Sequence, residues 1–268
     1  MIRKWCIPLT TLALVFGSML AAGSASAAAM APHPGASHFT PGGLMVRPAG
    51  HVAGSPKAHL NQDESTNWSG YAVTGASGAF HSISASWVEP TGTCTSRRSA
   101  QYSSFWVGLD GFNSNSVEQT GTDVDCNGRT PVYYGWYEMY PAFPVNYTNT
   151  VKPGDHFSAS VTFTGTETYT LVLTDSTQGW THTTVKSETG LARSSAEVIT
   201  EAPSSSSGVL PLADFGTVNY STSSANGTSL GTQRPTQIIM INSSGQQKDS
   251  TSAIAGNGAF SNTWIRSS

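Results

Sequence analysis

The chain has 268 residues and a formal net charge of −3, and only 11% of its residues are charged. No basic patch is present, which argues against a nucleic-acid partner. The three cysteines form no Cys-x-x-Cys pair and there is no His-Glu-x-x-His segment, so we expect neither a metal site nor a cofactor.

Residues 1–27 predict an export signal. Arg3 and Lys4 give a charged start, an apolar run extends from Cys6 to Leu20, and Ala25-Ser26-Ala27 is a small-residue cleavage site. The run is shorter than the roughly 20 residues that span a bilayer, and no later segment is apolar for that long. We therefore expect a secreted product that is not held in a membrane.

Residues 28–64 predict a prosegment or linker, largely without regular structure. The segment is rich in Ala, Pro, Gly and His, and its Lys/Arg residues are Arg47 and Lys57. Every Asp and Glu of the chain lies at or beyond Asp63. A basic segment of this kind can cover an acidic cleft near neutral pH and leave as the carboxylates protonate. It is therefore a candidate inhibitor of its own domain, and a disordered spacer is the alternative.

Two cysteines remain once Cys6 leaves with the signal, namely Cys94 and Cys126. In an oxidising compartment they most simply form one disulfide. That bond would close a loop around the segment from Trp106 to Gln119.

Residues 65–268 have the size of one domain and an all-β texture. Ser, Thr, Gly, Val and aromatic residues dominate, and no amphipathic helix of convincing length is present. Apolar and polar residues alternate from His156 to Phe163 and again from Tyr169 to Leu173. Turn signals such as Lys152-Pro153-Gly154-Asp155 separate these runs. The pattern predicts an antiparallel β-sandwich.

Several predicted strands carry an unusual polar face. Side chains alternate along a strand, so residues two apart share a side. The faces so defined contain Trp106 and Asp110; Gln119 with Val117, Gly121 and Asp123; Tyr134, Trp136, Glu138 and Tyr140; and Glu197, Ile199 and Glu201. Faces this rich in Trp, Tyr, Glu and Gln fit a concave binding surface better than plain solvent exposure.

An ordered series of short segments resembles the glutamic peptidase family, the eqolisins. These segments are Asn67-Trp68-Ser69-Gly70-Tyr71, Ser86-Trp87-Val88-Glu89-Pro90, Trp106-Val107-Gly108-Leu109-Asp110-Gly111, Glu118-Gln119-Thr120-Gly121, Trp136-Tyr137-Glu138-Met139-Tyr140-Pro141, Val151-Lys152-Pro153-Gly154-Asp155, Ala196-Glu197-Val198-Ile199-Thr200-Glu201 and Ala213-Asp214-Phe215-Gly216. They cover essentially the whole of residues 65–268, in order.

The resemblance implies a sandwich of two bent seven-stranded sheets, similar to concanavalin A-like lectins, with the active site on the concave face. It also implies an acid-acting endopeptidase made with a removable propeptide. The catalytic glutamine of the family maps onto Gln119 and the catalytic glutamate onto Glu201. Val198 and Thr200 depart from the family pattern, and both fall on the face away from Glu201.

These two residue types suit peptide hydrolysis by an activated water. Glu201 can take a proton from the water and return it to the leaving nitrogen. Gln119 does not titrate, so its NH2 group can donate to the developing oxyanion. We expect both side chains to converge on one water molecule.

Further residues have less specific expected roles. Glu197 lies four residues before Glu201, roughly 13 Å away along the strand, and is expected to be a subsite or structural carboxylate. Asp110 and Glu138 are candidates for orienting Gln119 or Glu201, or are ordinary strand residues. Trp106 is expected to wall the cleft, and Trp68 and Trp136 to pack or to contact substrate. Tyr140 begins a segment, as far as Asn149, that resembles the mobile hairpin of the family.

Two rival functions use the same residues. A carbohydrate-binding lectin-like module also presents Trp, Tyr and Asp on a concave sheet, and a glycoside hydrolase could pair Glu138 with Glu201 as acid and nucleophile. Gln119 would be dispensable in both. The preferred reading is a monomeric peptidase that acts on polypeptide substrates.

Overall fold

The computed structural model describes residues 62–97, 99–205 and 208–268. Within these ranges the regular structure is β-strand apart from one short 3-10 helix, η1 (Leu230–Thr232). No helix in this part of the chain is long and apolar enough to cross a bilayer. The predicted signal, residues 1–27, and residues 28–61 of the predicted prosegment lie outside the described residues.

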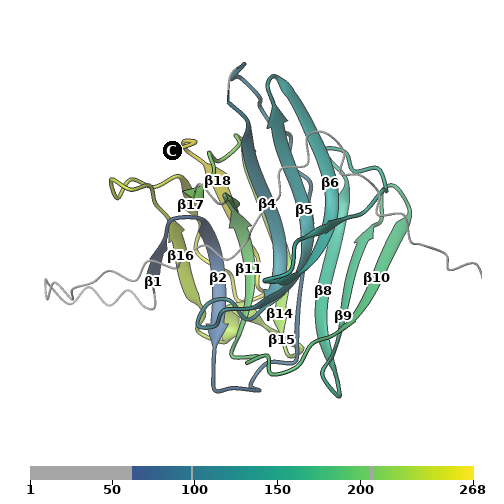
Figure 1. Ribbon diagram of the computed structural model, residues 1–268. Coiled ribbons are helices and arrows are strands. Elements are labelled where there is room, and N and C mark those ends of the chain that lie inside the picture. Colours follow the sequence, from purple (N-terminus) through teal and green to yellow (C-terminus); the bar gives the residue numbers. More distant parts are fainter. Residues whose placement is uncertain (1–61, 98, 206–207) are drawn as a thin grey trace, which may run out of the picture. The chain divides into compact units, whose positions relative to one another are not determined.

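Two large sheets form the domain (Figure 1). Sheet 1 has the order β1 (Gln62–Ser65), β16 (Thr236–Met240), β2 (Trp68–Thr74), β11 (Ser195–Glu201), β4 (Gln101–Leu109), β5 (Val117–Asn127), β6 (Thr130–Tyr140) and β7 (Val145–Asn146). Sheet 2 has the order β10 (Trp180–Ser187), β9 (Thr168–Asp175), β8 (His156–Gly165), β3 (Ser82–Val88), β14 (Thr217–Ala225), β18 (Phe260–Trp264) and β17 (Asp249–Thr251), with β15 (Thr228–Ser229) paired to β14. A separate pair joins β12 (Ser204–Ser205) to β13 (Gly208–Val209).

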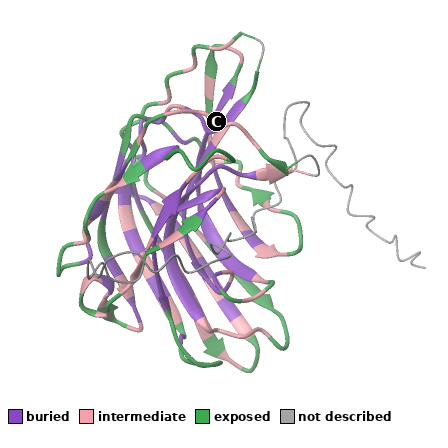
Figure 2. Cartoon of the chain, turned by 90° about the vertical axis from the view of Figure 1, so that its left-hand side faces the viewer, coloured by how far each residue is buried: buried purple, intermediate pink, exposed green. Residues whose placement is uncertain are grey.

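The main core lies between the two sheets. Phe105, Val107 and Leu109 of β4 pack in the same cluster as Leu171 and Leu173 of β9. Their alternation with outward-facing residues is the period that the sequence showed, and β9 alternates between buried and half-buried positions along its whole length. Strand β11 is buried at all seven positions, in keeping with its place in the middle of sheet 1. Buried positions run along many strands of the domain, while the connecting loops are mostly exposed or half-buried (Figure 2).

The sandwich confirms the predicted fold class, with two differences in detail. Each large sheet has eight strands where seven were expected, because very short strands such as β7 and β15 carry no detectable sequence period. Strand β1 pairs in parallel with β16, whereas the other strand pairs are antiparallel. Gln62, Asp63 and Glu64 therefore belong to sheet 1, although the sequence placed them in the prosegment.

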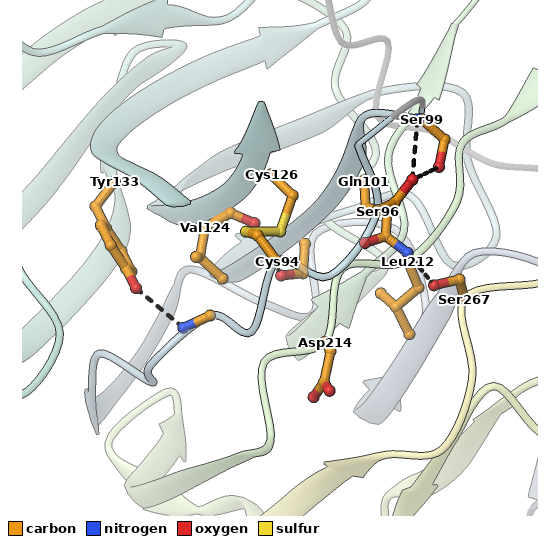
Figure 3. Close-up of a disulfide and its surroundings, with 12 residues drawn as sticks. Cys94, Ser96, Ser99, Gln101, Val124, Cys126, Tyr133, Leu212, Asp214 and Ser267 are labelled. Atoms are coloured by element: carbon orange, nitrogen blue, oxygen red, sulfur yellow. Dashed lines mark hydrogen bonds between the residues drawn. A yellow bond between two sulfur atoms is a disulfide. The ribbon is translucent and has the colours of Figure 1, made fainter. Parts of the chain in front are cut away.

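The predicted disulfide between Cys94 and Cys126 is present, with a Cα–Cα distance of 5.4 Å. It ties the segment before β4 to the end of β5 (Figure 3). Beside it the Gly92 N–H donates to Tyr133 Oη at 2.9 Å. The two cysteines are 32 residues apart in the sequence. Closing a loop of this length lowers the conformational entropy of the unfolded chain, which stabilises the folded state by about 3–4 kcal/mol. It thereby braces the strands that carry Trp106 and Gln119.

Candidate active site

The polar residues singled out in the sequence gather on the face of sheet 1 that points away from sheet 2. We call this the site face and define it by Gln119, Glu138, Glu201, Trp106 and Asp123. The pairing of the strands fixes it, because residues opposite one another across a sheet share a side. One row across the sheet runs Glu197, Gly108, Gln119, Glu138, and another runs Trp68, Glu201, Ser104, Asp123, Tyr134.

Gln119 and Glu201 thus lie on the same side of the same sheet. Strand β4 lies between their strands, β5 and β11, so they are not on adjacent strands. Glu138 lies on β6, on the side of Gln119 that is away from β11. It accepts a hydrogen bond from Gln119, and the charge of Glu201 contributes to the raised pKa of Glu138.

Glu201 is held by two donors in a buried environment. The Trp106 Nε1–H donates to Oε2 at 2.9 Å, and the Asn67 amide donates to Oε1 at 3.1 Å. Burial nevertheless raises the pKa of Glu201 to about 8, because desolvation of the carboxylate outweighs both hydrogen bonds. Glu201 therefore carries a proton throughout the acidic range.

Trp106 is placed by glycines on its own and the neighbouring strand. A Cβ at Gly121, which pairs with Trp106, would come within 2.6 Å of the Trp106 Cβ, and one at Gly108 within 2.9 Å of its ring. Larger residues at these positions would push the indole away from Glu201. Trp68 packs edge-on against the same indole, with ring centroids 5.0 Å apart. Trp106 is therefore a hydrogen-bonding partner of the acid, and more than the cleft wall that the sequence predicted.

Asn67 is a site residue that the sequence analysis missed. Its side chain is fully buried, and its Oδ1 accepts from the Ser65 hydroxyl at 3.0 Å, which leaves Nδ2 to face Glu201. The available signal was its position next to Trp68 in the first segment of the family resemblance. A short polar residue before a strand is usually a turn residue, so its function was not visible.

Replacing Asn67 with Ala is expected to lower kcat about fivefold, because the hydrogen bond that holds the neutral Glu201 carboxyl contributes about 1 kcal/mol. The donor stabilises the charged carboxylate, so its loss should also raise the pKa of Glu201 further. The alkaline limit of activity should then move upward. Steady-state kinetics against pH measure both effects, and Asn219→Ala on the exposed surface of sheet 2 is the control. An unchanged profile in Asn67→Ala would contradict this role.

Gln119 and Glu138 form a tight buried pair. They are directly opposite on β5 and β6, and Gln119 Nε2 donates to Glu138 Oε2 at 2.6 Å. Gln119 Oε1 and Glu138 Oε1 have no hydrogen-bond partner among the described residues. Burial, together with the charge of Glu201, raises the pKa of Glu138 to about 10 even though the bond from Gln119 favours the ionised form. The predicted contact between Glu138 and Gln119 is present.

Asp110 and Glu197 occupy other positions. The Asp110 carboxylate accepts from the backbone N–H groups of Arg193 at 2.6 Å and Ser194 at 2.9 Å. It therefore fastens the chain at the start of β11, and its hydrogen bonds go there instead of to Gln119 or Glu201. Glu197 is fully buried on the site face, in the row of Gln119. Burial raises its pKa well above the ordinary value, with the charge of Asp110 adding to the effect.

A second apolar cluster surrounds these polar groups. It includes Trp68, Trp106, Trp136 and Ile199, and Tyr140 packs against it. The hairpin after Tyr140 returns as β7, which pairs with β6 at Trp136 and Tyr137. Trp68 and Trp136 thus pack in this apolar cluster, and Trp136 also donates a hydrogen bond to Asp123.

The two departures from the family pattern have a structural reason. Val198 belongs to the core between the sheets. The Thr200 hydroxyl lies 3.0 Å from Tyr220 Oη of sheet 2, which also donates to the Ile199 carbonyl at 2.8 Å. Both side chains point away from Glu201. The contact of Thr200 with Tyr220 attaches the end of β11 to sheet 2. No group of three or more His, Cys, Asp and Glu side chains suited to a metal ion occurs among the described residues.

Comparison with known proteins gives one consistent result. The Peptidase A4 family profile matches residues 66–264. Aspergillopepsin-2 of Aspergillus niger is 27% identical over 203 residues, which are 65% of this chain and 71% of that protein. Scytalido-glutamic peptidase, solved with a transition state analog inhibitor, has a TM-score of 0.63 and 26% identity, over 75% of this chain and 98% of that one.

A further structure, SCP-B of the Eqolisin family in complex with the tripeptide Ala-Ile-His, has a TM-score of 0.61 and 25% identity over the same shares. The fold and the matches together define a β-sandwich peptidase, a hydrolase. The chain belongs to the Peptidase A4 family, the glutamic peptidases or eqolisins.

Proposed function

We propose that this protein is a secreted glutamic endopeptidase that acts in acid on polypeptides, with Gln119 and Glu201 as its catalytic residues. The observation that carries the proposal is the environment of Glu201. It is a buried carboxyl with two fixed donors, on the same sheet face as an uncharged amide. The order of the chain suits export and activation by acid, with a signal, a basic prosegment and then an acidic domain. The prosegment is the proposed inhibitor of the monomeric precursor.

The pKa of Glu201 favours a particular role in the reaction. A neutral carboxyl can donate its proton from one oxygen toward the substrate while the other oxygen accepts a proton from the attacking water. Glu201 is neutral below about pH 8, so it enters the acidic reaction in this bifunctional form. The reaction needs its proton, and activity should fall as the pH rises toward the pKa. The protonated form is therefore present over the whole acidic range, as an acid-acting enzyme of this kind requires.

Glu138 has a defined part in presenting Gln119. A protonated Glu138 can donate its O–H to an amide oxygen, which an ionised one cannot do. A half-turn of the Gln119 amide would bring its Oε1 to that hydrogen and release the NH2 group toward the substrate carbonyl. The raised pKa of Glu138 keeps this donor available in acid. Gln119 then supplies the oxyanion donor, worth about 3–4 kcal/mol in comparable sites.

The glycoside-hydrolase alternative is poorly supported by the same groups. A retaining glycosidase needs one ionised carboxylate as nucleophile. Both Glu138 and Glu201 have pKa values raised by burial, to about 10 and about 8, so neither is ionised in acid. Incubating the purified protein with denatured protein and with polysaccharides across acidic pH separates the two activities. Cleavage of polysaccharide but not of protein would refute the proposal.

Gln119→Ala is expected to lower kcat about 10²- to 10³-fold with a small effect on KM, because the lost donor acts on the transition state. The thermal midpoint at acid pH should change little. Cleavage of a fluorogenic peptide measures the rates, and Gln62→Ala, which removes an exposed amide on β1, is the control. Full activity in Gln119→Ala would remove this residue from the mechanism.

A further inference from the structure

A second acidic group lies on the site face beside the reacting pair. Asp123 and Asp125 are two residues apart and lie on the same side of β5. Tyr134 of β6 contacts both. Tyr134 Oη is 3.0 Å from Asp123 Oδ2 and 2.7 Å from Asp125 Oδ2. The Trp136 Nε1–H donates to Asp123 Oδ1 at 2.5 Å. Asp123 is 1% exposed and Asp125 9% exposed.

These three contacts need more hydrogens than the two aromatic residues supply. Tyr134 has one O–H and Trp136 one N–H, and an ionised carboxylate is an acceptor only. Tyr134 can donate to one aspartate, so its contact with the other requires a hydrogen on that carboxyl. Asp123 and Asp125 therefore hold a proton between them.

The surroundings assign the proton to Asp125. Asp123 receives the Trp136 N–H, while Asp125 Oδ1 has no partner among the described residues. The chain of donors then runs from the Asp125 O–H to Tyr134 Oη and from the Tyr134 O–H to Asp123. Burial raises both pKa values, that of Asp123 to about 7 and that of Asp125 well above its ordinary value, where the charge of Asp123 adds to the effect. Once the pH rises above about 7, the negative charge of the pair thus falls on Asp123.

Asp123 faces Glu201 across one strand. Both pair with Ser104 of β4, from opposite sides and on the same face. The negative charge of Asp123 contributes to raising the pKa of three further acidic groups. These are Glu201 on β11, Glu138 on β6 and Glu89 in the loop after β3. An ionised Asp123 makes release of the Glu201 proton harder.

We propose that Asp123, supported by Tyr134 and Asp125, is a positioning residue that helps to retain the proton on Glu201 and so extends activity toward higher pH. The proposal rests on the proposed role of Glu201. Asp125 acts as a fixed hydrogen-bond donor in this arrangement, and its charge is not used. An asparagine at this position should therefore act as Asp125 does, whereas removing the charge of Asp123 or the Tyr134 hydroxyl should lower the alkaline limit of activity.

The test compares Asp123→Asn, Tyr134→Phe and Asp125→Asn through the pH dependence of kcat/KM. Asp123→Asn removes the charge, and Tyr134→Phe removes the donor that stabilises it. Both should move the alkaline midpoint down by roughly half to one pH unit. Asp125→Asn should leave the midpoint in place, because its NH2 group donates to Tyr134 as the protonated acid does. An unmoved midpoint in Asp123→Asn, or an equal shift in Asp125→Asn, would overturn the proposal.

A second measurement separates this proposal from the assignment of Glu201. Carboxyl 13C NMR of the wild type and of Glu201→Gln follows the aspartates without any need for turnover. We expect one of the pair to stay protonated well above pH 7, and Tyr134→Phe to change its titration. Ordinary titration of both aspartates near pH 4 would refute the shared proton even if Glu201→Gln is inactive. An active Glu201→Gln would instead refute the proposed catalytic role.

Discussion

Glu201→Gln is expected to abolish peptidase activity, with a loss of about a thousandfold or more, while the protein stays folded. The amide keeps the shape of the side chain, and its one oxygen can accept from either Trp106 or Asn67, but it has no acidic proton to give and accepts none from water. The expected loss is therefore in kcat. Hydrolysis of denatured protein in acid measures it, and the precursor should also fail to process itself after acidification.

Glu197→Gln is the matched control for this experiment. Glu197 lies on the same strand and the same face, is fully buried, and also has a raised pKa. A merely structural effect of neutralising a buried acid on β11 would appear in both variants. We expect near-normal activity in Glu197→Gln. Equal losses in the two variants would show that the charge state of β11, and not the chemistry of Glu201, is responsible.

Unfolding on the alkaline side is the second large expected effect. Burial raises the pKa of nine carboxyls, those of Glu89, Glu118, Asp123, Asp125, Glu138, Asp175, Glu197, Glu201 and Asp249. Above about pH 4.5 the unfolded chain releases these protons while the folded chain keeps them. The unfolded state then binds fewer protons, so the free energy of unfolding falls with rising pH. This stability is complete below about pH 4 and is lost as the pH rises through the folded values, from about 7 upward.

The size of the effect is large compared with the stability of a domain. Glu118 faces the core between the sheets, and burial raises its pKa from 4.5 to about 9. At about 1.4 kcal/mol per pH unit, its ionisation costs on the order of 5 kcal/mol, within a total stability of about 5–15 kcal/mol. Lys248, whose pKa burial lowers to about 8, works in the opposite direction but is a single group. We expect cooperative unfolding at mildly alkaline pH.

Glu118→Gln tests this explanation directly. The variant cannot ionise, so its urea midpoint should exceed that of the wild type at about pH 8 and differ little at about pH 4. Urea titrations followed by tryptophan fluorescence measure both. Glu64→Gln, on the exposed surface of β1, should change neither midpoint. A Glu118→Gln protein that unfolds at the same pH as the wild type would contradict the proposed cause of alkaline unfolding.

Much of the fold was visible in the sequence because alternation leaves a direct signal. The runs at His156–Phe163 and Tyr169–Leu173 lie within β8 and β9, and the disulfide followed from two remaining cysteines. Short strands such as β7 were not predictable, because two residues show no period and form only when β6 is beside them. Strand β1 was not predictable for a similar reason, since Gln62 to Glu64 are strand residues only through their pairing with β16.

The sequence alone determined which side chains share a strand face, because that depends only on the two-residue period, and the family resemblance singled out Gln119 and Glu201. Which of these side chains become neighbours was decided by the order of strands in sheet 1. That order sets β4 between the two catalytic candidates and brings Asn67 to Glu201 across 134 positions of sequence. It also places Glu138 on Gln119 and Tyr134 on two aspartates. Hydrogen bonds and the desolvation of carboxyls arise only between segments that folding brings together, so they leave no local trace in the sequence.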